Sequence, residues 1–166
     1  MSELLLGAVQ KPNNMIVVSD GFRTIQQAID ATPTYGTTVI MPGTYRIEEP
    51  LKLMKPQNLI GFGRGTVIVN IAGKDAIQIG NVNPRLMVAG ITISGIYFAV
   101  VGRTGTCINC QNLHRSKLRD LSCMGGKYGL YMRGSLINEI DGFQASGMYA
   151  SELPKEVARG ETAIAC

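Results

Sequence analysis

The sequence predicts an all-β fold, a parallel β-helix in which short strands stack coil upon coil behind one N-terminal α-helix. Three observations lead to this prediction. Short apolar stretches alternate with Gly, Asn, Asp and Ser turns, apolar residues recur at fixed offsets, and only one stretch has the pattern of an amphipathic helix. The Asn-Gly dipeptide of tight hairpins is absent, which argues against an antiparallel meander.

The composition of the 166-residue chain fits one globular domain, with 45% hydrophobic residues and a formal net charge of +4. The charges are scattered, so we expect tolerance for acidic partners and no nucleic-acid interface. No apolar run approaches the roughly 18 residues of a membrane span, and Leu4–Leu6 is too short for a signal peptide. The four cysteines are therefore expected to be reduced.

The sequence predicts two parts, an N-terminal arm over residues 1–14 and a β-helix domain over residues 15–166. A β-branched strand is expected at 15–18 and an amphipathic helix at 24–31. Thr24 is a suitable N-cap, and Pro33 ends the helix.

From residue 38 onward, each expected strand is four to seven residues long. The expected strands are TVIM (38–41), GTVIVN (65–70), AIQIG (76–80), GITIS (90–94), TCINC (106–110), KLRDLSC (117–123), YGLYM (128–132) and DGFQAS (141–146).

Internal repeats give the register of the coils. An offset of 22 residues places Leu118 on Ile140, Leu121 on Phe143, Cys123 on Ala145, Ile108 on Leu130 and Cys110 on Met132. An offset of 30 places Val88 on Leu118, Ile91 on Leu121 and Ile93 on Cys123. Strands that repeat while loops vary in length are typical of a solenoid. The predicted inward columns are Ile77–Ile108–Leu130–Ile164, Ile79–Cys110–Met132–Cys166, Leu121–Phe143 and Cys123–Ala145.

The last residues, 163–166, are expected to continue the column of Ile108 and Leu130, so the chain stops in mid-coil. We therefore expect a β-helix that is open or truncated at its C-terminal end. An uncovered β-helix end exposes strand edges and core, so another chain or domain is expected to cover it.

A family resemblance covers about residues 15–147. The motifs SDG, TIQQAIDA, TVIMPGTYRI, LKL and LIGFG occur in order between residues 16 and 63. This order resembles the opening of the pectate-lyase-like superfamily, which includes pectate lyases, pectin methylesterases and phage tailspikes. The resemblance implies a right-handed parallel β-helix with an N-terminal capping α-helix. It carries over no catalytic residue, because catalytic groups in those enzymes lie mostly beyond the length present here.

Aromatic and basic side chains in the later coils are candidates for binding. Tyr128 and Tyr131 can stack on sugar rings, while Arg115 and Arg133 can pair with acidic sugars. The alternative is that these aromatics cover loops or contact a neighbouring subunit.

The cysteines and the single histidine form the pattern C-x2-C-x3-H-x8-C over residues 107–123, which imitates a zinc site. Cys110 and Cys123, however, fall in apolar columns with Met132 and Ala145, so we expect core packing, with no metal and no cofactor. A redox or intersubunit role for the thiols is a further alternative.

The acidic residues favour charge ladders over catalysis. Asp120 and Asp141 are a possible hydrolase pair. The 22-residue offset instead places Glu139 beside Lys117 and Asp141 beside Arg119 on adjacent coils.

Glycines 61, 63 and 65 imitate a phosphate loop, but no helix follows them, so we expect turn glycines.

Three classes of function follow from the resemblance. The first is a structural or receptor-binding component of a phage particle, of the tailspike or surface-decoration type, located in the virion. The second is the N-terminal portion of a polysaccharide-degrading enzyme, such as a lyase, hydrolase or epimerase, located outside the cell. The third is a non-catalytic carbohydrate-binding β-helix. The sparse acidic residues and the open end favour the first class, and its resemblance to tailspikes implies a homotrimer.

Overall fold

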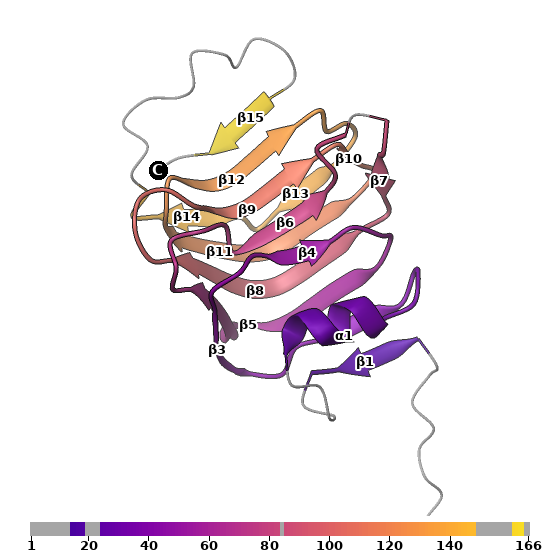
Figure 1. The fold of residues 1–166 in the computed structure, drawn as a ribbon, viewed down its shortest axis with the longest axis horizontal. Helices are drawn as coiled ribbons and strands as arrows, with labels where there is room; N and C mark the ends of the chain where they lie inside the picture. Colours follow the sequence, from indigo (N-terminus) through magenta and orange to yellow (C-terminus); the bar gives the residue numbers. More distant parts are fainter. Residues whose placement is uncertain (1–13, 19–23, 84, 149–160, 165–166) are drawn as a thin grey trace, which may run out of the picture.

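The computed structural model describes residues 14–18, 24–83, 85–148 and 161–164. The chain climbs through stacked coils, from α1 and β1 at one end to β12–β15 at the other (Figure 1). The elements are β1 (Met15–Val17), α1 (Ile25–Ala31), β2 (Thr37–Val39), β3 (Gly43–Ile47), β4 (Leu51–Leu53), β5 (Asn58–Asn70), β6 (Ile77–Gly80), β7 (Val88–Ala89), β8 (Thr92–Val100), β9 (Thr106–Gln111), β10 (Leu113–His114), β11 (Lys117–Gly125), β12 (Tyr128–Arg133), β13 (Glu139–Asp141), β14 (Gln144–Ser146) and β15 (Glu161–Ile164).

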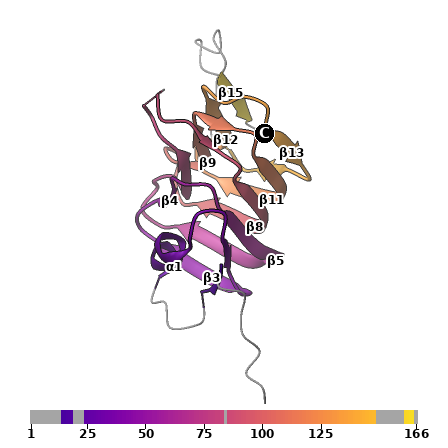
Figure 2. The same cartoon turned by 90° about the vertical axis from the view of Figure 1, so that its right-hand side faces the viewer.

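The strands form three sheets that make the walls of a solenoid, and Figure 2 shows the same stack from the side. The longest sheet runs β1-β2-β5-β8-β11-β13, with β3 added on β5 and β14 on β11. A second sheet runs β4-β6-β9-β12-β15, and β7 pairs with β10. Within the described residues, every strand pair other than β12–β15 is parallel, so the all-β parallel β-helix is confirmed.

The single described helix lies where the sequence predicts it. Thr24 adopts an extended N-cap conformation, and its hydroxyl accepts the Gln27 backbone N–H at 3.1 Å. The buried stripe of Ile25, Ala28 and Ile29 packs against the core near β1 and β4. No helix in the described part of the chain has the length and apolar character needed to cross a membrane.

The inward columns of the second sheet are confirmed for β6, β9 and β12. Ile77 pairs with Ile108, which pairs with Leu130, and all three side chains are fully buried. Cys110 pairs with Met132 in the neighbouring column. Alternation along each strand therefore sends apolar side chains inward at every second position.

The offset of 30 residues between the strands near 90 and 118 is wrong. Ile93 pairs with Leu118, Ile96 with Leu121 and Phe98 with Cys123, an offset of 25. β8 continues past Gly95, which has a φ of +64°, as far as Val100. Its second half therefore supplies inward residues that the shorter predicted strand lacks.

The C-terminal segment also differs from the prediction, because β15 runs antiparallel to β12. Ile164 does pair with Leu130, but Met132 faces Thr162 and not Cys166, which lies outside the described residues. An antiparallel strand can use the free edge of β12 without a further parallel crossover. Of the predicted arm at 1–14, only Asn14 is described, and its carbonyl accepts the Thr37 N–H at 2.7 Å.

Candidate functional site

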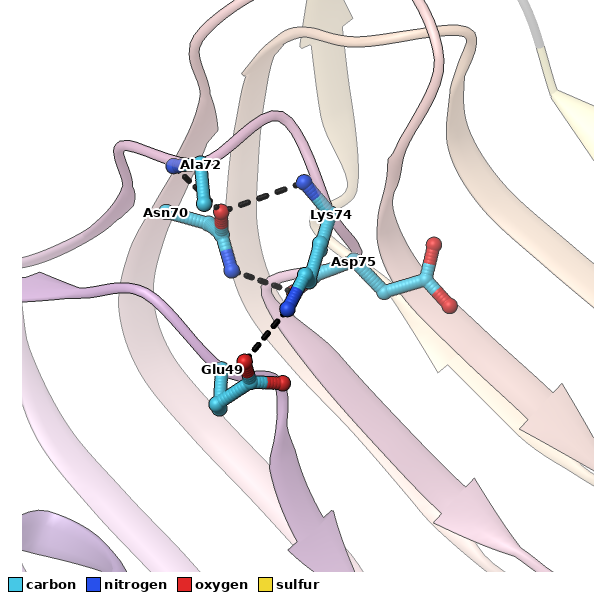
Figure 3. A network of polar contacts seen from close by, with 5 residues as sticks. All are labelled: Glu49, Asn70, Ala72, Lys74 and Asp75. Carbon is cyan, nitrogen blue, oxygen red and sulfur yellow. Dashed lines mark hydrogen bonds and ion pairs between the residues drawn. The ribbon is translucent and has the colours of Figure 1, made fainter.

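A turn between β5 and β6 places Asp75 just before the start of β6, which is an inner strand of the second sheet (Figure 3). The buried Asn70 side chain organises this turn. Its Oδ1 accepts the backbone N–H groups of Ala72 and Lys74 at 3.0 and 3.2 Å, and its Nδ2 donates to the Asp75 carbonyl at 2.9 Å. Lys74 also forms an ion pair with Glu49. The turn is therefore held from both sides, and Asp75 has a fixed position.

The Asp75 carboxylate joins two successive coils. Its Oδ1 accepts the Thr106 backbone N–H at 2.8 Å. Its Oδ2 accepts the side-chain amides of Gln78 at 3.0 Å and Asn109 at 2.8 Å. A carboxylate with three donors fixes the orientation of both amides.

The outward positions of the second sheet form a polar row. The register places Lys52, Gln78, Asn109 and Tyr131 side by side on β4, β6, β9 and β12. Gln111 adds a hydrogen bond to Asn109 Oδ1 at 2.8 Å. We call the surface formed by Asp75, Gln78, Asn109, Gln111 and Tyr131 the amide face. Its side chains are half-buried, so they are partly open to a ligand.

Two of the predicted binding residues meet at the end of the amide face. The rings of Tyr128 and Tyr131 stack with centroids 5.9 Å apart and planes 26° apart. The Lys127 ammonium lies 5.1 Å from the Tyr128 ring centroid, a cation–π distance. Together these residues form an aromatic platform next to the row of amides, in which Tyr128 is buried and Tyr131 is half-buried, so a ligand can reach the ring of Tyr131.

The two predicted arginines lie in different parts of the fold, and of the two only Arg133 is on the same strand as Tyr128 and Tyr131. Arg133 is exposed at the opposite end of β12 from Tyr128, where it pairs in register with Gln111. Arg115 is exposed in the turn between β10 and β11, and its backbone N–H donates to Leu136 O at 3.2 Å. The binding role of all four residues stays a prediction.

A surface cleft of about 500 Å³ adjoins the amide face. Its lining includes Glu49, Lys52, Lys74, Asp75, Gln78 and Thr104. Carboxylate, amide, hydroxyl and ammonium groups thus converge on one depression, which offers both donors and acceptors to a polar ligand.

The cysteines of the zinc-like pattern lie in the core. Cys107, Cys110 and Cys123 are buried and unpaired as disulfides, and the predicted pairings of Cys110 with Met132 and Cys123 with Ala145 are confirmed. Burial raises the pKa of the Cys110 and Cys123 thiols. No group of three potential metal ligands occurs within the described ranges.

The predicted charge ladder is confirmed. Lys117 pairs in register with Glu139 and Arg119 with Asp141. The Glu139 carboxylate forms one ion pair with Arg119 and a second with Lys117, the latter at 3.2 Å. Hydrogen bonds from Arg119 and then Lys117 hold the pKa of Glu139 below its usual range.

The prediction of turn glycines at 61–65 is wrong, because this stretch lies within β5. Register shifts between Ile60 and Val67 show that the strand bulges here, and Gly63 has a φ of +63°. Glycine tolerates this left-handed conformation, which explains its use at a bulge. No helix follows, so the phosphate-loop alternative has no support.

Comparison with known proteins connects this geometry to a fold. The chain superposes on a crystal structure of a pectin methylesterase mutant in complex with a hexasaccharide, with a TM-score of 0.56 and 15% identity. The match covers 88% of this chain and 58% of the length of that protein. This chain therefore shares the parallel β-helix fold of that protein. No protein-family model matches its sequence, and no curated protein matches it either. At this identity the likeness to the pectin methylesterase concerns the fold alone.

Sequence reasoning missed four of the five residues of the amide face. Asp75, Gln78, Asn109 and Gln111 were not among the candidate binding residues. The signal was the alternation of polar side chains with inward apolar ones in DAIQIG and TCINCQ, at positions that face outward once the register is known.

Proposed function

We propose that this pectate-lyase-like β-helix binds polysaccharide through its amide face and serves as a structural or receptor-binding component of a phage particle. The observation that carries the binding proposal is the row of amides, anchored on Asp75, that runs into the Tyr128–Tyr131 stack.

The chemistry of the amide face suits sugar hydroxyl groups. Gln78 and Gln111 each donate one hydrogen bond within the protein, so each amide keeps a second N–H and its carbonyl oxygen for a ligand. Sugar hydroxyls both donate and accept, and aromatic rings pack on the apolar faces of sugars. An amide row beside an aromatic platform therefore complements an extended glycan chain.

The similarity to the pectin methylesterase supports the carbohydrate part of the proposal, since that protein's structure contains a hexasaccharide.

The assembly part of the proposal rests on the β13 end of the stack. Ile140 on β13 is 38% exposed, whereas Leu118, its inward partner on β11, is fully buried. Contact with other protein subunits would bury this apolar surface. A homotrimer in the virion is the proposed form, by resemblance to tailspikes. Light scattering on the purified chain tests it, and a stable monomer would count against it.

Glycan binding is tested with the Tyr131→Ala variant. We expect binding to a panel of surface polysaccharides to weaken by about tenfold, because the accessible ring of the aromatic platform is lost. Tyr35→Ala is the matched control, since Tyr35 is 73% exposed in the loop between α1 and β2. Equal polysaccharide affinities of the wild type and Tyr131→Ala would contradict glycan binding at the amide face.

A polysaccharide-degrading enzyme is the second candidate, favoured by one observation. Glu49 and Asp75 both line the cleft beside the amide face, and glycoside hydrolysis uses two carboxyl groups. Release of reducing ends from a bound polysaccharide, abolished in Glu49→Gln and in Asp75→Asn, would establish it. Binding without product release would reject it.

A further inference from the structure

One wall of the solenoid carries the most exposed apolar side chains among the described residues. β7 and β10 form this wall at one side of the stack (Figure 1), and the bridge from His114 to Leu136 extends it to the next coil. Five side chains on the wall, or at the corner beside it, exceed the other described large hydrophobic side chains in exposure: Val82 (81%), Ile137 (76%), Tyr35 (73%), Met87 (64%) and Leu136 (60%). Exposed apolar side chains that gather in one place mark contact with a protein or a membrane.

The register of the strands gathers these side chains along successive coils. The first residues of β2, β5, β8, β11 and β13 lie side by side in the longest sheet. Tyr35, Arg115 and Ile137 stand two positions before β2, β11 and β13, so they share one corner of the stack. Met87 lies directly before β7 and points outward, because the next side chain, Val88, is buried. We call this surface, from Tyr35 to Ile137 and over β7 and β10, the corner wall.

The turn after β6 brings Val82 to the same surface. The carbonyl of Asn81, the residue before Val82, accepts a hydrogen bond from the side-chain amide of Asn112 at 2.6 Å. Asn112 directly precedes β10, and its backbone carbonyl accepts the Val88 N–H at 3.2 Å. Val82 therefore lies beside β7 and β10.

Three residues of the corner have a left-handed backbone conformation. The angle φ is +63° at Tyr35, +44° at Arg115 and +57° at Ile137. This conformation is uncommon outside glycine, and a β-branched residue such as Ile137 is a clear outlier there. Gly90 occupies the same corner on a neighbouring coil with a φ of +72°, so glycine serves this turn without strain. The larger side chains cost stability here, and a contact outside the chain gives a reason for their presence.

The corner wall carries positive charge and no carboxylate. Neither Asp nor Glu occurs in the segments that form it, residues 81–91, 111–116 and 133–138. Arg85 and Arg115 are exposed among the apolar side chains. Two copies of this face would repel each other, because a two-fold contact places like charges together. The complementary partner is negatively charged at its surface and apolar beneath it, and an anionic lipid bilayer has both properties.

We propose that the corner wall docks the protein on the surface of an anionic lipid bilayer. Val82, Met87 and Ile137 enter the boundary between the head groups and the acyl chains. Arg85 and Arg115 pair with lipid phosphates. The chain lies on the bilayer without crossing it. The amide face belongs to the second sheet and is not part of the corner wall, so this docking is independent of the proposed glycan binding.

The test is co-sedimentation of the full chain with vesicles of phosphatidylcholine, either alone or with about one third phosphatidylglycerol. We expect binding to the anionic vesicles to be about tenfold tighter and to weaken as salt is added. Arg115→Gln should weaken binding to the anionic vesicles about fivefold, because one arginine near the lipid surface is lost. Arg46→Gln, at an exposed arginine on β3, is the matched control.

Ile137→Gly tests the apolar contact without weakening the fold. Glycine suits the φ of +57° at this position, so the melting temperature should stay the same or rise. Binding to the anionic vesicles should nevertheless fall about fivefold, because an inserted side chain is lost. Val101→Gly is the control, because Val101 is 55% exposed just after the other end of β8.

Insertion is read from a single introduced tryptophan, since the chain contains none. The emission of Met87→Trp should shift to shorter wavelength with anionic vesicles and be quenched by brominated lipid, whereas Val101→Trp should show neither change. Absence of vesicle binding, equal binding to the two vesicle types, or equal losses in Ile137→Gly and Val101→Gly would overturn the proposal.

Discussion

The two faces of β6, β9 and β12 show how one set of strands meets two different demands. On the inner face, Ile77, Ile108 and Leu130 stack in a column that is fully buried. On the outer face, Gln78 and Asn109 share one carboxylate. The inner face is stabilised by burial, which any apolar side chain of suitable size supplies. The outer face is organised by hydrogen bonds with specific partners, so it can present a defined chemistry to a ligand.

The largest effect is expected on the inner face. Leu130→Ala should lower the free energy of unfolding by about 2–5 kcal/mol, because it leaves a cavity in a close-packed column. Tyr131→Ala changes the next residue, which points outward, and should cost about 0.5–1.5 kcal/mol through the lost aromatic pair. Denaturant unfolding measures both. Equal stability of the two variants would contradict the proposed difference between the inner and the outer face.

An intermediate effect is expected for Asp75→Asn on the outer face. The amide of Asn would present N–H groups to donors that now reach a carboxylate, so about 1.5–3 kcal/mol of stability should be lost. The control is Asp30→Asn, because Asp30 accepts a single side-chain hydrogen bond from Gln26 on the exposed surface of α1. That variant should stay within about 0.5 kcal/mol of wild type in the same unfolding measurement.

The smallest effect concerns the charge ladder and its pH dependence. The folded-state pKa of Glu139 is lowered, so its stabilising contribution is present above the unfolded-state pKa of about 4.3 and is lost as the pH falls through the lowered value. Glu139→Gln should therefore reduce the melting temperature slightly near neutral pH and leave it unchanged at strongly acidic pH. Glu48→Gln, at an exposed glutamate on a loop, should show no such pH-dependent difference.

The parts of the fold that burial controls could be predicted from the sequence. Alternating apolar residues give the columns of Ile108 with Leu130 and Cys110 with Met132, and the Thr24 cap begins the helix where its hydroxyl finds a backbone donor. Local signals were sufficient here, because each depends on one strand or one helical turn.

The remaining parts depend on contacts that the sequence pattern does not encode. Offsets of 25 and 30 both place apolar residues on apolar residues, and only the extent of β8 past Gly95 decides between them. Leu130 can pair with Ile164 whether β15 runs parallel or antiparallel to β12. The periodicity of apolar residues therefore does not give the direction of β15. The role of Asp75 depends on hydrogen-bond donors from two coils. One of these donors, Asn109, lies 34 residues away in the sequence.

The most direct test of the binding proposal is an NMR titration of the ¹⁵N-labelled chain with the polysaccharide fragment that binds best. The proposal predicts shifts in the side-chain amide signals of Gln78, Asn109 and Gln111 that saturate with one common dissociation constant. The side-chain amide of Asn83, in the loop after β6, should not move. Saturable binding that leaves the three amide-face signals unchanged would contradict the proposal.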